Sequence, residues 1–279
     1  LTLWDSSAFV ATAPAFGSVQ SATSGSAGTL TITKPTGTAS GDLLIAVIGT
    51  ASNTSAATLT GWTAVAQSAC PGGGGGVCHQ SVLWKLAGGS EPASYTFTLS
   101  ANAASSGAIL RYTGVDQSNP VLDFGTPVNG NSGTAQAPDV EATRENTRVV
   151  RTMTQNNNRT STWAASTSRI NANQATITVN VADGTHGDGG AVGTENDTLS
   201  GNTKWIAETL ILKGVDATAT IPNGHWELDV DETSAVNGNA DSDINAIGIR
   251  ADDGDATTGG TELNVYYDSL TEIGINIGE

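Results

Sequence analysis

Leu43-Leu44-Ile45-Ala46-Val47-Ile48 is the longest apolar run of this chain, and Gly41-Asp42 stands directly before it. A short apolar run that follows turn-forming residues is typical of a strand buried on both faces. A membrane-spanning helix needs about 20 apolar residues. The run therefore predicts a buried β-strand and no membrane span.

Similar short runs precede and follow this one, and each is bounded by Gly, Pro, Asn or Ser. They are Leu30-Thr31-Ile32-Thr33, Gly61-Trp62-Thr63-Ala64-Val65, Ser81-Val82-Leu83-Trp84-Lys85-Leu86, Tyr95-Thr96-Phe97-Thr98-Leu99 and Ala108-Ile109-Leu110-Arg111-Tyr112. No stretch keeps a helical period over ten residues. Short strands at regular spacing indicate an all-β protein, a β-sandwich or jelly roll.

The second hundred residues repeat the first, which indicates an internal duplication. Asn146-Thr147-Arg148-Val149-Val150 takes the place of Gly41-Asp42-Leu43-Leu44-Ile45, and Thr162-Trp163-Ala164 that of Gly61-Trp62-Thr63. Residues 207–216 echo residues 107–116 and end on the same Gly-Val-Asp. The halves predict two small sandwiches or one double-layered unit, and the weaker second copy favours the single unit.

Three regions follow from this pattern. Residues 1–15 form an N-terminal extension that could be donated as a strand, and residues 16–216 form the duplicated sandwich, with halves at about 16–116 and 140–216. The stretch 116–142 contains Pro120, Pro127 and Pro138 and predicts extended connections. Residues 217–279 form a small acidic β module, with strands expected at 226–230, 244–250, 263–267 and 273–279.

The net charge of −16, from 27 acidic and 11 basic residues, limits the partners of the chain. Such a field repels phosphate backbones, and no basic stripe offsets it. We therefore expect no nucleic-acid binding. The charge either forms a solvated acidic surface or favours divalent cations.

Part of the sequence resembles a known domain family. The residues are Gly41-Asp42-Leu43-Leu44-Ile45-Ala46, Gly61-Trp62-Thr63, Ser90-Glu91-Pro92-Ala93-Ser94-Tyr95-Thr96-Phe97 and Tyr112-Thr113-Gly114-Val115-Asp116. They resemble a β-sandwich domain of bacterial secreted surface proteins and phage virion proteins. Residues 248–266 look like a module of large bacterial exported proteins. Neither resemblance brings a catalytic motif, so both imply a location and a structural role.

Two cysteines, Cys70 and Cys78, flank Pro71 and a glycine run. Their short separation makes a local disulfide at a hairpin tip geometrically easy in an oxidising compartment, with free thiols as the alternative. A zinc site would need two further ligands, and His79 alone does not supply them. The chain opens at Leu1 without a signal peptide, which favours a processed chain or a fragment.

No catalytic motif is visible. The three histidines His79, His186 and His225 are far apart in sequence, with neither an HExxH pattern nor a GxSxG elbow. The glycine runs at 72–76 and 187–190 lack the features of a phosphate loop. We expect a protein that is not an enzyme.

Calcium is the one cofactor that the sequence suggests, with solvated acidic turns as the alternative. Ca²⁺ takes six to eight oxygen ligands, and Asp-rich turns can supply them. The candidate ligands are Asp229, Asp231, Asp241, Asp243, Asp252, Asp253, Asp255 and Glu262.

Strand exchange between copies is the assembly mechanism that we expect. An open sheet edge accepts a strand from a neighbour, and a head-to-tail contact of this kind builds a filament. The alternative is a strand that folds back on its own domain. The donor residues at the two ends of the chain are Leu1, Leu3, Trp4, Ile273, Ile275 and Ile277.

The sequence thus favours a non-catalytic structural subunit of an extracellular filament or cell-surface assembly, which forms homo-oligomers or polymers. The alternatives are a phage virion decoration or fibre protein on the virion surface, and a carbohydrate-binding or adhesive module. Glycans could attach at the weak sequons of Asn53, Asn158 and Asn196. Trp62, Trp84, Trp163 and Trp205 are expected to be core residues rather than sugar platforms.

Overall fold

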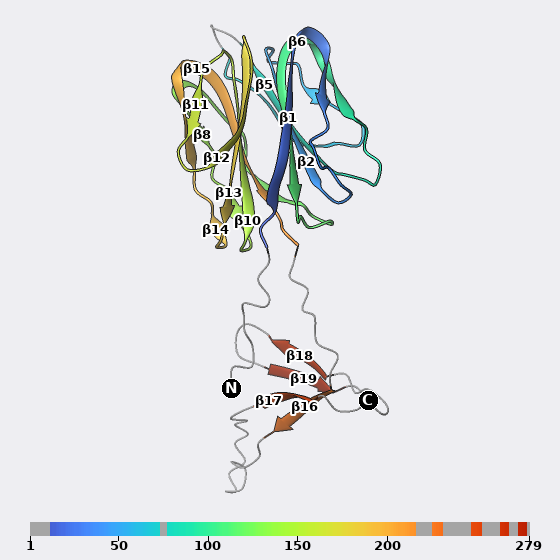
Figure 1. The fold of residues 1–279 in the computed structure, drawn as a ribbon. Helices are drawn as coiled ribbons and strands as arrows, with labels where there is room; N and C mark the ends of the chain where they lie inside the picture. Colours follow the sequence, from blue (N-terminus) through green and yellow to red (C-terminus); the bar gives the residue numbers. More distant parts are fainter. Residues whose placement is uncertain are drawn as a thin grey trace. The chain divides into compact units, whose positions relative to one another are not determined.

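The computed structural model describes residues 12–72 and 77–215 in full, and the backbone of four strands beyond them. The described residues contain no helix, and most of them lie in antiparallel strands (Figure 1). The chain divides into two compact units, the sandwich within Phe9–Ala217 and a second unit that holds the C-terminal strands. The prediction of an all-β fold is confirmed.

The first half of the sandwich forms one antiparallel sheet with the order β1-β6-β2-β5-β4, and β3 pairs with the outer part of β6. Its strands are β1 (Ala15–Thr33), β2 (Leu43–Thr50), β3 (Ala57–Thr58), β4 (Thr63–Ala69), β5 (His79–Leu86) and β6 (Ser94–Thr113). The predicted runs at 95–99 and 108–112 belong to one 20-residue strand, β6. The first strand is also longer than expected, because small polar residues precede its apolar end.

The second half repeats this order as β11-β15-β10-β13-β12, and β7 and β8 also pair with β15. Its strands are β7 (Val121–Phe124), β8 (Val128–Ala137), β10 (Thr147–Gln155), β11 (Ser161–Trp163), β12 (Thr167–Gln174), β13 (Ile177–His186) and β15 (Glu195–Leu212), and β9 (Glu141–Ala142) pairs with β14 (Gly190–Ala191). The stretch at 116–142, expected to hold only connections, contains β7, β8 and β9.

The two sheets match residue by residue, because a β-bulge occurs at the same place in both. One bulge lies between Ala64 and Ala66 on β4, and the other between Ser168 and Ile170 on β12. Superposing the bulges makes Ala46 on β2 equivalent to Arg151 on β10. The duplication is therefore visible in the hydrogen-bond register as well as in the sequence.

A second shared irregularity fixes the outer parts of the long strands. The β1–β6 register shifts between Thr98 and Ala103, and the β8–β15 register shifts between Thr198 and Thr203. Thr198 and Thr203 lie 100 positions after Thr98 and Ala103, which is the offset of the sequence repeat. Each residue of β6 thus has its counterpart 100 positions later on β15.

Apolar cores on both faces of the sheets hold the sandwich together. Alternate residues of β2 point to opposite faces, so Leu43 contributes to the core between the two sheets and Leu44 to a core inside the first repeat. The second repeat has an inner core of its own around Met153 and Trp205. The sandwich is therefore one unit with a core shared by the two repeats, and each repeat also has an apolar core of its own.

One detail of the predicted repeat is wrong: Trp163 is not the counterpart of Trp62. Trp163 lies on β11 beside Asp197 of β15, where the first repeat has Leu59. The true counterpart of Trp62 is Ser166, because Trp62 precedes Thr63 of β4 as Ser166 precedes Thr167 of β12. Trp163 and Trp205 are buried and Trp62 and Trp84 are partly buried against apolar cores, in keeping with the expected core role.

The C-terminal unit contains two antiparallel strand pairs. The first joins β16 (His225–Val230) to β17 (Ile247–Asp252), and the second joins β18 (Leu263–Tyr267) to β19 (Ile273–Ile277). The predicted tail strand thus pairs with a strand of its own chain, opposite Leu263 to Tyr267.

A disulfide joins Cys70 to Cys78, eight residues apart, at the end of the β4–β5 hairpin. Closing a loop of this length stabilises the fold by about 2.5 kcal/mol through the entropy of the unfolded chain. We expect the double variant Cys70→Ala and Cys78→Ala to lose about this much free energy of unfolding in urea. Reduced wild-type protein should unfold at the midpoint of the variant, and equal midpoints for oxidised wild type and variant would contradict the expectation.

Candidate functional site

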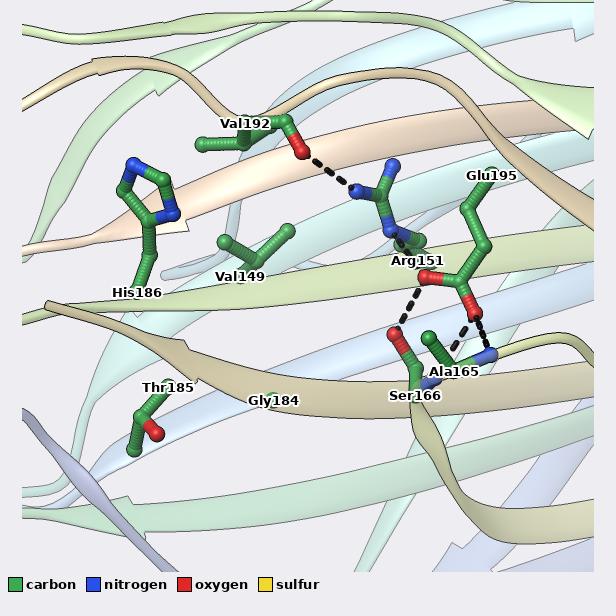
Figure 2. A pocket seen from close by; sticks show the side chains of 9 residues that line it. All are labelled: Val149, Arg151, Ala165, Ser166, Gly184, Thr185, His186, Val192 and Glu195. Atoms are coloured by element: carbon green, nitrogen blue, oxygen red, sulfur yellow. Dashed lines mark hydrogen bonds and ion pairs between the residues drawn. The ribbon is translucent and has the colours of Figure 1, made fainter. Parts of the chain in front are cut away.

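A cavity of about 220 Å³ opens in the second repeat, between the ends of β10 and β13 and the loop before β15. Figure 2 shows Arg151, Glu195 and Ser166 on one side of it and His186 and Thr185 on the other. The lining residues are Val149, Arg151, Ala165, Ser166, Gly184, Thr185, His186, Val192 and Glu195. The cavity is thus lined by charged, polar and apolar side chains together.

The cavity is lined by Ser166, the residue that takes the place of Trp62 of the first repeat. Trp62 packs edge-on against Tyr95 and Phe97, with ring centroids 5.2 Å apart in both pairs. In the second repeat the smaller Ser166 stands at the position of Trp62, and Arg151, which pairs with Glu195, stands at the position of Ala46. An aromatic ring in one copy is thus replaced by a serine and an ion pair beside a cavity in the other.

The neighbours of the indole have changed as well. Tyr95 and Phe97 of β6 correspond to Glu195 and Asp197 of β15. Their cross-strand partners Ile32 and Leu30 correspond to alanines, Ala137 and Ala135. The inner core of the second repeat has therefore become smaller and more polar, although its strands have kept their register.

Glu195 is the centre of a hydrogen-bond network at the cavity wall. Its carboxylate accepts hydrogen bonds from the amides of Ala165 and Ser166 at 2.8 and 2.7 Å, and from the Ser166 hydroxyl at 2.6 Å. Arg151 forms an ion pair with it at 2.8 Å. Burial raises the pKa of Glu195, but these bonds and the Arg151 charge outweigh burial, and the pKa is lowered. The carboxylate stays ionised at neutral pH.

Asp197 lies one alternation further along β15 and is fully buried. Burial raises the pKa of its carboxyl to about 7, and hydrogen bonds from Ser161 and Asn180 lower it only in part. The Asn180 amide donates to its Oδ2 at 3.2 Å. Asp197 thus takes the place of the apolar Phe97, whereas its partner Asn180 takes the place of Ser81.

A charged cluster lies between the two repeats. Asp183 on β13 is fully buried and accepts hydrogen bonds from Arg148, from Arg169 at 2.8 Å and from the Tyr112 hydroxyl at 2.9 Å. Arg169 is the residue bulged out of β12, and its guanidinium also covers the ring of Phe16 at 4.3 Å. The bulge therefore directs a second cation at Asp183.

A second buried carboxyl lies among the polar groups between the repeats. Glu208 on β15 is fully buried opposite Thr152 of β10. Gln80 of the first repeat donates to Thr152 at 3.0 Å and accepts from Thr154 at 2.9 Å. Burial raises the pKa of Glu208 to about 8, and the nearby Gln80 side chain lowers it in part. Glu208 is therefore largely protonated at neutral pH.

The polar side chains of these networks bond mainly to one another. The Ser166 hydroxyl donates to a carboxylate that three other donors also reach, and it has no hydrogen bond to His186 in the described part of the chain. Within residues 12–72 and 77–215, no group of three His, Cys, Asp or Glu side chains is placed to hold a metal ion. The part of the chain that the structure describes also contains no helix that could cross a membrane.

The predicted calcium ligands lie almost entirely outside the described residues. Asp229 and Asp252 are on β16 and β17, where Asp252 lies opposite His225 and Asp229 lies opposite Gly248. Four residues of strand separate the two along this strand pair, roughly 13 Å. Asp231, Asp241, Asp243, Asp253, Asp255 and Glu262 are not described.

The other predicted sites divide in the same way. Ile273, Ile275 and Ile277 lie on β19, opposite β18 of the same chain, whereas Leu1, Leu3 and Trp4 lie outside the described residues. The three sequon residues Asn53, Asn158 and Asn196 are all exposed. His79 is buried on β5 and His186 lines the cavity, so the structure does not bring these two histidines into one site.

Sequence reasoning missed the polar interior of the second repeat. Glu195 and Asp197 alternate with Leu199 on β15 as Tyr95 and Phe97 alternate with Leu99 on β6. An alignment of the two halves with an offset of 100 would have placed both acids at core positions. Comparison with protein-family models, with curated proteins and with solved structures finds no match to this chain. The class that the fold defines is an all-β protein built on a duplicated sandwich.

Proposed function

We propose that this protein is a non-catalytic structural subunit of an extracellular or cell-surface assembly, and that its copies join through strand edges. The observation that carries the proposal is the edge strand β1. It has 19 residues, contains no charged residue and no proline, and pairs only with β6 among the described strands.

Such an edge is unusual for a protein that stays alone in solution. Soluble proteins blunt sheet edges with charges, proline, bulges or short strands, because unpaired main-chain groups attract other strands. The bulges of β1 lie near its start and near its middle, and between them Ser18–Ser24 pairs with Arg111–Ser105 without interruption. This regular stretch is long enough to add one strand from a second copy.

The second sheet offers an edge of the same character. Strand β8 also lacks charged residues, and Val128 at its start is 39% exposed. Phe124 on the neighbouring β7 is 47% exposed. Two different edges on one subunit favour a heterologous contact, which builds a filament when the rotation does not close.

Two further features support the proposal. The Cys70–Cys78 disulfide fits a secreted protein in an oxidising environment. The buried charges of the sandwich form internal ion pairs, as at Asp183 and Glu195, which fits a structural role. A phage virion decoration or fibre protein would have the same features, and electron microscopy of the native source distinguishes a virion from a cell-surface filament.

A single charge on the edge tests the proposal. Thr23→Lys puts an ammonium group at an exposed position of β1. We expect the protein concentration at which half of the chains are assembled to rise at least tenfold. A tenfold rise corresponds to a loss of about 1.4 kcal/mol in the free energy of association. Thr98→Lys is the matched control, because exposed Thr98 lies on β6, which is paired on both sides. Sedimentation velocity and electron microscopy measure the assembly.

Weaker assembly of Thr23→Lys alone supports the β1 edge as the assembly surface. If Thr23→Lys and Thr98→Lys assemble like the wild type, or if the wild type stays monomeric at every concentration, the edge is not an assembly surface. Deleting residues 1–13 in parallel tests whether the N-terminal extension is the donated strand. Unchanged assembly after this deletion leaves the tail around β19 or the β8 edge as the partner.

A further inference from the structure

A glutamine of the first repeat lies between two threonines of the second. The Nε2 atom of Gln80 donates a hydrogen bond to the Thr152 hydroxyl at 3.0 Å, and the Thr154 hydroxyl donates to the Oε1 atom of Gln80 at 2.9 Å. All three side chains are buried. Two hydroxyl groups therefore lie against one carboxamide, whose carbon is the atom that an oxygen nucleophile attacks.

The two sheets approach each other closely at this point. Gly49 of β2 lies opposite Gln80 in the first sheet. A Cβ atom at residue 49 would lie 2.7 Å from the Cγ2 atom of Thr154 and 2.9 Å from a methyl carbon of Val179, so a side chain here would push the second sheet away. Glycine at this position thus permits the contact between Gln80 and Thr154. Burial also keeps out water, which would compete with a hydroxyl for the amide carbon.

A carboxyl group completes the arrangement. Glu208 lies opposite Thr152 on the neighbouring strand, so the two side chains are on the same face of the sheet. Neither carboxyl oxygen of Glu208 has a hydrogen-bond partner among the described residues. The nearby Gln80 side chain lowers the pKa of Glu208 only in part, and burial raises it to about 8. At neutral pH the carboxyl therefore has one oxygen that donates a proton and one that accepts.

We propose that Thr152 and Gln80 form an ester bond that joins the two repeats covalently. The Oγ1 atom of Thr152 adds to the Cδ atom of Gln80, and the bond between Cδ and Nε2 breaks. Glu208 accepts the hydroxyl proton of Thr152 and gives its own proton to the departing nitrogen, which leaves as ammonia. The Thr154 hydroxyl stabilises the negative charge that develops on Oε1. The step needs no oxidant, reductant or further reactant.

Proximity supplies the rate of this step. A carboxamide is a weak electrophile, but groups held in contact react as if one of them were present at about 10⁵ M or more. The reaction occurs once in each chain and acts on no external substrate, so it agrees with a structural role. Gln80 and Thr152 are 72 positions apart, so the ester closes a much longer loop than the Cys70–Cys78 disulfide does. It does not depend on the proposed edge assembly.

The intact mass of the full chain tests the proposal. We expect the purified wild type, kept folded at neutral pH and then reduced, to be lighter than its sequence by the mass of one ammonia molecule. Digestion with trypsin should yield the peptide that ends at Lys85 joined to the peptide of residues 152–159. Mild alkali should separate the two peptides, because it hydrolyses an ester and leaves amide bonds intact.

Three variants assign the roles. Thr152→Val removes the nucleophile and should abolish the loss of ammonia. Glu208→Gln keeps the shape of the side chain without its acidic proton, and it should slow the reaction about a hundredfold. Thr147→Val is the matched control, because Thr147 is another buried threonine of β10 whose hydroxyl has no partner among the described residues. This control should form the ester at the rate of the wild type.

The wild type alone decides the main point, so the test stays valid if a variant fails to fold. The ester is refuted if folded wild-type protein keeps its full mass, or if any loss of ammonia maps to residues other than Gln80. The assignment of the nucleophile is refuted if the joined peptides persist in Thr152→Val, and that of Glu208 if Glu208→Gln reacts as fast as the wild type. Each outcome leaves the edge assembly unaffected, because that is measured by sedimentation.

Discussion

Glu208→Gln is expected to remove a large pH dependence from the stability of the sandwich. Glu208 is fully buried between the repeats, and burial raises its pKa from 4.5 to about 8. The unfolded chain ionises near pH 4.5 while the folded chain keeps the proton until about pH 8. The contribution of this group to stability is therefore greatest below pH 4.5 and is lost as the pH rises toward 8.

The magnitude follows from linkage. Each pH unit in this window removes about 1.4 kcal/mol, so the wild type loses roughly 5 kcal/mol through Glu208 across the window between its unfolded and folded pKa values. The Glu208→Gln variant has no proton to release at this position. The difference between the two proteins in free energy of unfolding should therefore change by this amount across the window. Urea titrations at closely spaced pH values measure it.

Two controls make the pH experiment specific. Glu141→Gln, at an exposed position of β9, should reproduce the wild-type profile. Asp197→Asn should remove a separate component at lower pH, because burial raises the pKa of Asp197 from 3.8 to about 7. Parallel pH profiles for the wild type and Glu208→Gln would show that this carboxyl is solvated in the folded protein, contrary to the structure.

The second large effect is expected at Asp183. Asp183→Ala should lower the free energy of unfolding by about 3 to 5 kcal/mol, because it leaves two guanidinium groups without their buried anion. Arg148 and Arg169 both pair with Asp183, and the Tyr112 hydroxyl loses its acceptor as well. Asp188→Ala, at an exposed bend, is the control. Chemical denaturation of both variants measures the difference.

A triple variant separates the loss of a partner from the value of the cluster itself. Replacing Asp183 by Leu together with Arg148 and Arg169 by Met removes all the charges, and it should recover most of the lost stability. The first repeat supports this expectation, since it has Trp84 at the position of Asp183. A triple variant as unstable as Asp183→Ala would mean that the charges themselves hold the repeats together.

The apolar strands were predictable from local pattern, and the small-residue strands were not. The run at 43–48 is the core of β2, because six consecutive apolar residues are buried only where both faces of a sheet are covered. The first half of β1, in contrast, is built mainly from Ser, Ala, Thr and Gly and gives no alternation. Its pairing is set by β6, a tertiary partner that a local window does not contain.

The interior of the second repeat was hidden for a different reason. A single-sequence pattern assigns acids such as Glu195 and Asp197 to the surface, since burying a carboxylate is costly without partners. Their partners, Arg151 and Asn180, lie on other strands and come together only in the fold. The duplication itself was visible, but the alignment paired Trp62 with Trp163, which concealed the exchange of Trp62 for Ser166.

Amide hydrogen exchange in β1 tests the central claim, the joining of copies through an open sheet edge, most directly. In dispersed protein, the outward amides of Ser18–Ser24 lack a partner among the described strands, whereas β2 is paired on both sides. The account predicts that assembly slows exchange in this part of β1 at least tenfold, about 1.4 kcal/mol, and leaves β2 unchanged. Equal exchange of β1 in dispersed and assembled protein would contradict it.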